Sequence, residues 1–118
     1  MNDGGKPRRP AGLGRAGRVL WASLVDGFDF EPHELVVVGQ ACRVADRIAA
    51  LDRVVDGQGV TVADAKGDVR AHPALVESRQ QRITLARLLA VLRLPDEGDV
   101  RPQRRPGVRG AYGLQAVS

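Results

Sequence analysis

The stretch from Glu31 to Gly59, EPHELVVVGQACRVADRIAALDRVVDGQG, is the longest helical pattern in the chain and limits how the rest can pack. Pro32 suits the first helical position, because its missing N–H would have no helical partner there. The carboxylates of Glu31 and Glu34 favour the positive end of the helix dipole. The glycines of DGQG permit the left-handed turn that ends a helix. The sequence therefore predicts a helix from about Pro32 to about Val55.

Apolar side chains on this predicted helix form two neighbouring rows. The first row contains Val37, Ala41, Val44, Ile48, Leu51 and Val55, and the second contains Leu35, Val38, Cys42, Ala45 and Ala49. A polar strip on the opposite side contains Gln40, Arg43, Arg47 and Arg53. Such a wide apolar arc exceeds what one partner helix covers. Either two helices or a neighbouring subunit should pack on it.

Shorter patterns lie on both sides of this segment. Apolar spacings of three and four predict a helix over about residues 14–28, and a third helix is expected from Pro73 to about Leu94, ended by Pro95. His72 is interpreted as its cap. Between the second and third helices, alternating valines around the turn DAKGD predict a short β-hairpin over about residues 59–71. An isolated hairpin is barely stable, so we expect this one to lean on the helices.

These elements predict a mainly α fold of three helices, with a short β-hairpin between the second and third, that assembles as a homo-oligomer. Residues 13–95 would form this helical oligomerisation and core domain. The flanking residues 1–12 and 96–118 are rich in Gly, Pro and Arg, and we expect both to be disordered, basic tails.

Several functional classes lack their usual residue patterns. No run approaches the roughly 20 apolar residues that cross a bilayer, and the N-terminus does not resemble a signal peptide. The single cysteine, Cys42, cannot form an internal disulfide, which fits a reducing cytoplasm. Its place in an apolar row favours a packing role. His33 and His72 lie outside any metal-ligand spacing. The segment GLGRAG (12–17) resembles a nucleotide-binding loop only loosely, since no strand precedes it. We expect no enzyme activity, catalytic residues, metal or cofactor.

Basic side chains cluster toward both ends of the chain. The net charge is +4 overall, with +4 in residues 1–20 and −4 in residues 21–71. A basic flank beside an acidic body favours a polyanion partner, and the alternative is a pair of solvated tails. The candidates for contacts with a phosphate backbone are Lys6, Arg8, Arg9, Arg15 and Arg18 in one arm and Arg101, Arg104, Arg105 and Arg109 in the other. The third-helix arginines Arg79, Arg82 and Arg87 are interpreted as solvated or ion-paired with Asp46, Asp52 or Asp56.

A chain of this size favours self-association. Small domains bury only about 60% of their surface alone and are marginally stable. Two long helices with broad apolar arcs would gain most by packing against copies of themselves, while the polar residues 77–82 face solvent. The residues expected to pack within or between subunits are Val37, Ala41, Val44, Ile48, Leu51, Val55, Leu85, Leu88, Leu89 and Leu92.

Four stretches together suggest a family: LGRAGRVLW (13–21), EPHELVVVGQACRVADRI (31–48), the hairpin, and HPALVESRQQR (72–82) continuing into LARLLAVLRLP (85–95). Over about residues 12–96 the chain resembles the small subunit of a tailed-phage terminase, in particular the group common in phages and prophages of GC-rich actinobacteria. The resemblance implies a non-catalytic component of the viral DNA-packaging motor in the bacterial cytoplasm. Such a subunit forms a homo-oligomeric ring, binds viral double-stranded DNA, and recruits or regulates the large ATPase/nuclease subunit.

One departure from that family affects where DNA would bind. Several small-terminase groups read DNA with an N-terminal helix-turn-helix, whereas only about a dozen residues precede the first predicted helix here. DNA contacts would then fall to the basic arms or the first helix, through the backbone. The alternative hypothesis is a small helical protein-interaction module, antitoxin-like or an adaptor, that binds a protein partner and no nucleic acid.

Overall fold

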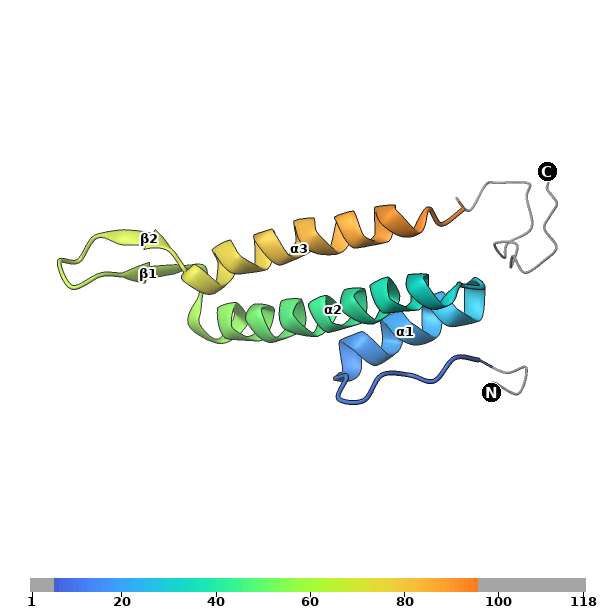
Figure 1. The fold of residues 1–118 in the computed structure, drawn as a ribbon. Helices are drawn as coiled ribbons and strands as arrows, with labels where there is room; N and C mark the ends of the chain where they lie inside the picture. The colour runs from blue at the N-terminus through green and yellow to red at the C-terminus, as the bar shows by residue number, and fades with distance from the viewer. Residues whose placement is uncertain (1–5, 96–118) are drawn as a thin grey trace.

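The computed structural model describes residues 6–95 of the 118-residue chain (Figure 1). The elements, in chain order, are α1 (Arg15–Gly27), α2 (Pro32–Gln58), β1 (Thr61–Ala63), β2 (Val69–Ala71) and α3 (Pro73–Leu92). The predicted mainly α fold, with a hairpin between the second and third helices, is therefore confirmed. Among the helices described, none combines the length and apolar character that a membrane span requires.

The ends of α2 follow from local chemistry. The backbone N–H of Glu31 donates a 2.8 Å hydrogen bond to the Glu34 carboxylate, and Pro32 occupies the first helical position. Gly59 takes a φ of 90° and ends the helix. The helix thus continues to Gln58, almost one turn beyond the predicted end at Val55, because the chain leaves helical geometry only at the last glycine of DGQG.

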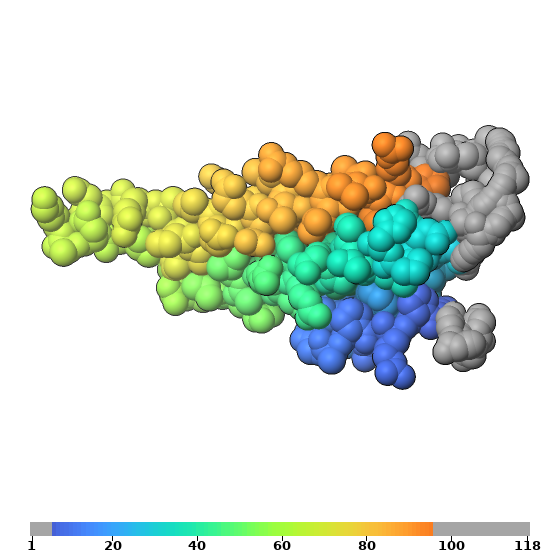
Figure 2. All heavy atoms as spheres, viewed as in Figure 1, coloured from blue at the N-terminus to red at the C-terminus, as the bar shows by residue number. Residues whose placement is uncertain are grey.

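The three helices form a layer with α2 in the middle (Figure 1). The helix α3 runs antiparallel along one side of α2, and the shorter α1 packs on the other side, beside the N-terminal half of α2 only. The radius of gyration is 18.6 Å, whereas a compact domain of about 100 residues has roughly 13 Å. Figure 2 shows the same elongated outline with all atoms drawn.

The apolar core lies where α1, the first half of α2 and the end of α3 meet. Its buried members are Leu13, Trp21, Leu24, Val25, Val38, Cys42 and Leu92. Two helices of the same chain therefore pack on the wide apolar arc of α2, as the first of the two alternatives for that arc predicts.

The hairpin extends past the end of the helices (Figure 1). Its strands pair antiparallel, with Val62 opposite Arg70, and Gly67 takes a φ of 88° in the turn. Val60 and Val69 are 57% and 69% exposed. The prediction that the hairpin leans on the helices is wrong, because the α2–β1 and β2–α3 connections direct both strands away from the layer.

The N-terminal segment before α1 has a defined course from Lys6 onward. Pro10 lies against Gly39 of α2, where an added Cβ would meet the proline ring at 3.6 Å, and Leu13 is buried in the core. The sequence predicts disorder for residues 1–12, and residues 6–12 differ from that prediction. The physical reason is that a proline and a leucine within the segment pack against the helices. Residues 1–5 and 96–118 lie outside the described part of the chain.

Candidate nucleic-acid interface

The start of α1 is held by a carboxylate from α2. Asp46 accepts hydrogen bonds of 2.7 Å from the backbone N–H groups of both Gly14 and Gly17. The first turn of a helix leaves its N–H groups without helical partners, and α1 has no side-chain cap of its own. Asp46 therefore acts as the missing cap and also fixes α1 against α2.

Gly17 permits this close approach of the two helices. A Cβ at this position would lie 2.7 Å from the backbone oxygen of Cys42 and 2.6 Å from the Asp46 carboxylate. Real Cβ atoms do not approach other atoms so closely, so only glycine fits unless α1 moves away. Gly14 and Gly17 of GLGRAG, a segment that the sequence suggests only as a loose loop motif, thus have a packing role against α2.

Cys42 is fully buried, as its apolar row predicted. Burial, together with the negative charge of Asp46, raises the pKa of its thiol to about 11. The thiol therefore stays protonated near neutral pH and packs as a small apolar group.

The candidate basic residues of the N-terminal arm divide into two groups. Lys6 forms a 2.6 Å ion pair with Asp26 of α1, which ties its charge to a neighbouring carboxylate. Arg8, Arg9, Arg15 and Arg18 are all exposed. Arg18 also donates a 2.7 Å hydrogen bond to the backbone oxygen of Leu13, which holds its guanidinium close to the start of α1. The candidates Arg101, Arg104, Arg105 and Arg109 lie outside the described residues.

The predicted packing residues are covered to different degrees. Ala41, Val44, Ile48 and Leu92 are buried. Half-buried positions are Val37, Leu51, Val55, Leu85, Leu88 and Leu89. On the outer side of α3, Ile83 and Val91 are 46% and 64% exposed. One chain therefore leaves the apolar rows of α2 and α3 only partly covered.

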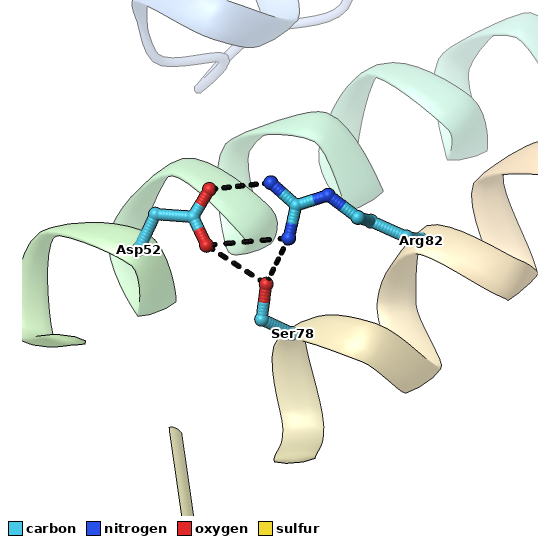
Figure 3. Close-up of polar contacts among 3 residues, drawn as sticks. All are labelled: Asp52, Ser78 and Arg82. Atoms are coloured by element: carbon cyan, nitrogen blue, oxygen red, sulfur yellow. Dashed lines mark hydrogen bonds and ion pairs between the residues drawn. The ribbon is translucent and has the colours of Figure 1, made fainter. Parts of the chain in front are cut away.

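A polar network joins the second half of α2 to α3 (Figure 3). The fully buried Ser78 hydroxyl donates a 2.8 Å hydrogen bond to Asp52, and Arg82 forms a 2.7 Å ion pair with the same carboxylate. Arg82 also donates to the Ser78 oxygen. These hydrogen bonds hold the pKa of the Asp52 carboxyl below its ordinary value. Of the proposed ion-pair partners, Asp52 is the one that Arg82 uses, so the polar half of α3 does not face only solvent.

His72 caps α3, as predicted. Its Nδ1 accepts a 2.9 Å hydrogen bond from the backbone N–H of Ala74. The proton then lies on Nε2, which donates to the side-chain oxygen of Gln58 at 2.7 Å. The imidazole therefore connects the end of α2 with the start of α3, and each of its two ring nitrogens forms a hydrogen bond.

Beside the polar network lies an open groove of about 310 Å³ between α2 and α3, lined by Arg47, Ala50, Leu51, Glu77 and Gln81. Within residues 6–95, no group of three or more His, Cys, Asp or Glu side chains is placed to hold a metal ion.

The sequence does not reveal the role of two residues, Asp46 and Gly17, that hold the start of α1 against α2. The sequence suggests Asp46 only as an ion-pair partner for α3, and Gly17 only as part of a loop motif. The available signal was the pair of glycines three residues apart at the start of α1, on the side that also carries Trp21 and Leu24.

Comparison with protein-family models, curated proteins and solved structures found no match to this chain.

Proposed function

We propose that this protein is a homo-oligomeric DNA-binding subunit of the small-terminase kind, without catalytic activity of its own. It binds viral double-stranded DNA and recruits or regulates a large ATPase/nuclease subunit. The observation that carries the proposal is the combination, on one small chain, of partly covered apolar helix faces with a group of exposed arginines around α1.

Self-association is supported by how little of α3 is buried. Within this helix only Ser78 and Leu92 are buried, although five further positions carry leucine, isoleucine or valine between residues 83 and 91. Burying one large apolar side chain contributes about 1.5–3 kcal/mol. A second copy packed on the α2–α3 face would gain this contribution from side chains that a single chain leaves half-exposed.

DNA binding is supported by the position of the arginines on a folded part of the chain. Arg8 and Arg9 lie next to Pro10, which packs on Gly39, and Arg15 and Arg18 lie in the first turn of α1. Cations held by folded backbone lose less conformational entropy on contacting phosphates than cations on a free tail. The large-subunit partner is proposed from the sequence resemblance over residues 12–96.

Two measurements on the intact chain test this proposal. Native mass determination should find a closed assembly of several copies. Titration with duplex DNA should give an affinity that falls steeply between about 50 and 200 mM salt, because phosphate contacts release counterions. A folded monomer, or an affinity insensitive to salt, contradicts the proposal. Absence of DNA binding even at low salt favours the protein-interaction module instead.

A further inference from the structure

The two broad sides of α2 carry charged side chains of opposite sign. On α2, Asp46 points toward α1. With about 100° per residue, Arg43 and Arg47 lie roughly 60° and 100° around the helix from Asp46 in one direction. The acidic Asp52 and Asp56 lie roughly 120° and 80° from Asp46 in the other direction. One broad side of α2 therefore carries arginines, and the other carries aspartates, of which Asp52 is ion-paired with Arg82 of α3.

The helix α1 adds a third arginine to the basic face. Gly17 contacts Cys42 of α2, so Arg18, the next residue, lies at the level of Arg43 along the layer. Arg18 is also about 100° around α1 from Gly17. The helices α1 and α2 run antiparallel. A residue at a given positive angle from the contact line on α1 therefore lies on the same side of the layer as a residue at that angle on α2. Arg18 and Arg43 thus face the same way.

The N-terminal segment brings two more arginines to the region. Pro10 lies on Gly39, which is one turn before Arg43 on α2 and close to the α1 contact line. Arg9 and Arg8 directly precede this proline, and both are exposed. None of these five arginines forms an ion pair with a carboxylate in the part of the chain that the structure describes.

We infer that Arg8, Arg9, Arg18, Arg43 and Arg47 form one phosphate-binding track, along which the backbone of duplex DNA lies. The inference rests on the proposed DNA-binding function and adds to it the α2 arginines, which the sequence places only in a polar strip. Arg43 and Arg47 are separated by about 6 Å along the axis, and a DNA strand offers a phosphate about every 3.4 Å along its own. Contacts of this kind bind DNA without reading its bases.

The test compares two pairs of exposed arginines in the full-length protein. The double variant Arg43→Gln/Arg47→Gln removes two charges from the track. The control Arg79→Gln/Arg87→Gln removes two charges from α3, about 100° and 180° around that helix from Ser78, which faces α2. Each phosphate contact contributes about 0.9 to the slope of log affinity against log salt, so the track variant should lower this slope by roughly 1.8. At about 0.1 M salt, its DNA affinity should fall more than tenfold.

The control variant should bind duplex DNA within about twofold of the unchanged protein. Helical content and native mass, measured on both variants, separate loss of binding from loss of folding or assembly. If the track variant keeps its affinity while the unchanged protein binds DNA, the inference is wrong and the proposed function stands. Equal losses in both variants also contradict it, because binding would then depend on total charge. If the unchanged protein binds no DNA, the proposed function and the track fail together.

Discussion

The α1 end of the layer (residues 13–44 and 85–95) and the hairpin end (residues 45–84) bury different kinds of side chain. The α1 end buries apolar groups such as Trp21 and Val38. The hairpin end buries Ile48 together with two polar residues, His72 and Ser78. Apolar burial stabilises without requiring one geometry, whereas each hydrogen bond requires its partner at a set position. The comparison shows how a chain with a short core uses polar contacts to align the part that the core does not reach.

The largest expected effect comes from filling the close contact at the α1 end. Gly17→Ala places a Cβ against the Cys42 backbone oxygen, which cannot move without α2. We expect a loss of roughly 1–3 kcal/mol in the free energy of unfolding, measured by urea denaturation. The matched change Gly57→Ala meets nothing within 4 Å and should instead stabilise by about 0.5–1 kcal/mol. Equal effects of the two changes would mean that the close approach at Gly17 does not constrain packing.

The cap from α2 is the next test of the α1 end. Asp46→Ala leaves the N–H groups of Gly14 and Gly17 without their acceptor, and we expect a loss of about 1–2 kcal/mol. Asp46→Asn keeps one acceptor oxygen, so its stability should lie between those of the unchanged protein and Asp46→Ala. The exposed Asp56 on the same helix serves as the control, with an expected change within about 0.5 kcal/mol for Asp56→Ala. Thermal unfolding checks the order of the three variants, and a neutral Asp46→Ala contradicts the capping role.

At the hairpin end, the cap of α3 should have a smaller effect. His72→Ala removes the acceptor for the Ala74 N–H and the bond to Gln58, and we expect a loss of about 1 kcal/mol. Hydrogen exchange should become faster first in the hairpin and the first turn of α3, while the α1 end stays protected. His33→Ala, at an exposed position, should leave exchange unchanged. Uniform loosening across both ends would remove the distinction between them.

The smallest expected effect is the pH dependence of the Asp52 network. Arg82 and Ser78 lower the pKa of Asp52, so the unfolded chain binds its proton first as the pH falls. The network therefore contributes to the free energy of unfolding above about pH 4, which is the ordinary pKa of an aspartate. This contribution is lost as the pH falls through the lowered pKa of Asp52. The Asp52 side chain is 37% exposed, so the contribution should stay below about 1 kcal/mol. The protein loses stability between about pH 5 and 3, and Asp52→Asn should make this loss smaller. Urea unfolding at each pH measures the difference.

Local patterns predicted the secondary structure well. Pro32 and His72–Pro73 marked the starts of α2 and α3, and the DGQG glycines marked the end of α2, because capping depends on neighbours in the chain. The turn around Gly67 likewise predicted the hairpin. The position of the hairpin could not be predicted in the same way, since it depends on the direction in which two connections leave the helices.

For the candidate interface, the sequence identified the arginines of the N-terminal segment and α1 but not their surroundings. Composition suggested disorder, whereas the packing of Pro10 on Gly39 gives residues 6–12 a defined place. The pairing of Lys6 with Asp26 joins residues 20 positions apart, and local spacing contains no information about it. The C-terminal arginines of the prediction lie beyond the described residues.

By itself, the sequence determined the helices, their caps, the hairpin turn and the burial of Cys42, because hydrophobic spacing and capping act over a few residues. Only the tertiary structure decided that α1 and α3 share the apolar arc of α2, that Asp46 caps α1, and that the hairpin extends away from the layer. These features depend on contacts between residues distant in the chain, such as Gly17 with Cys42 and Asp52 with Ser78. A periodic pattern specifies which side of a helix is apolar, but the partner on that side depends on how the helices pack.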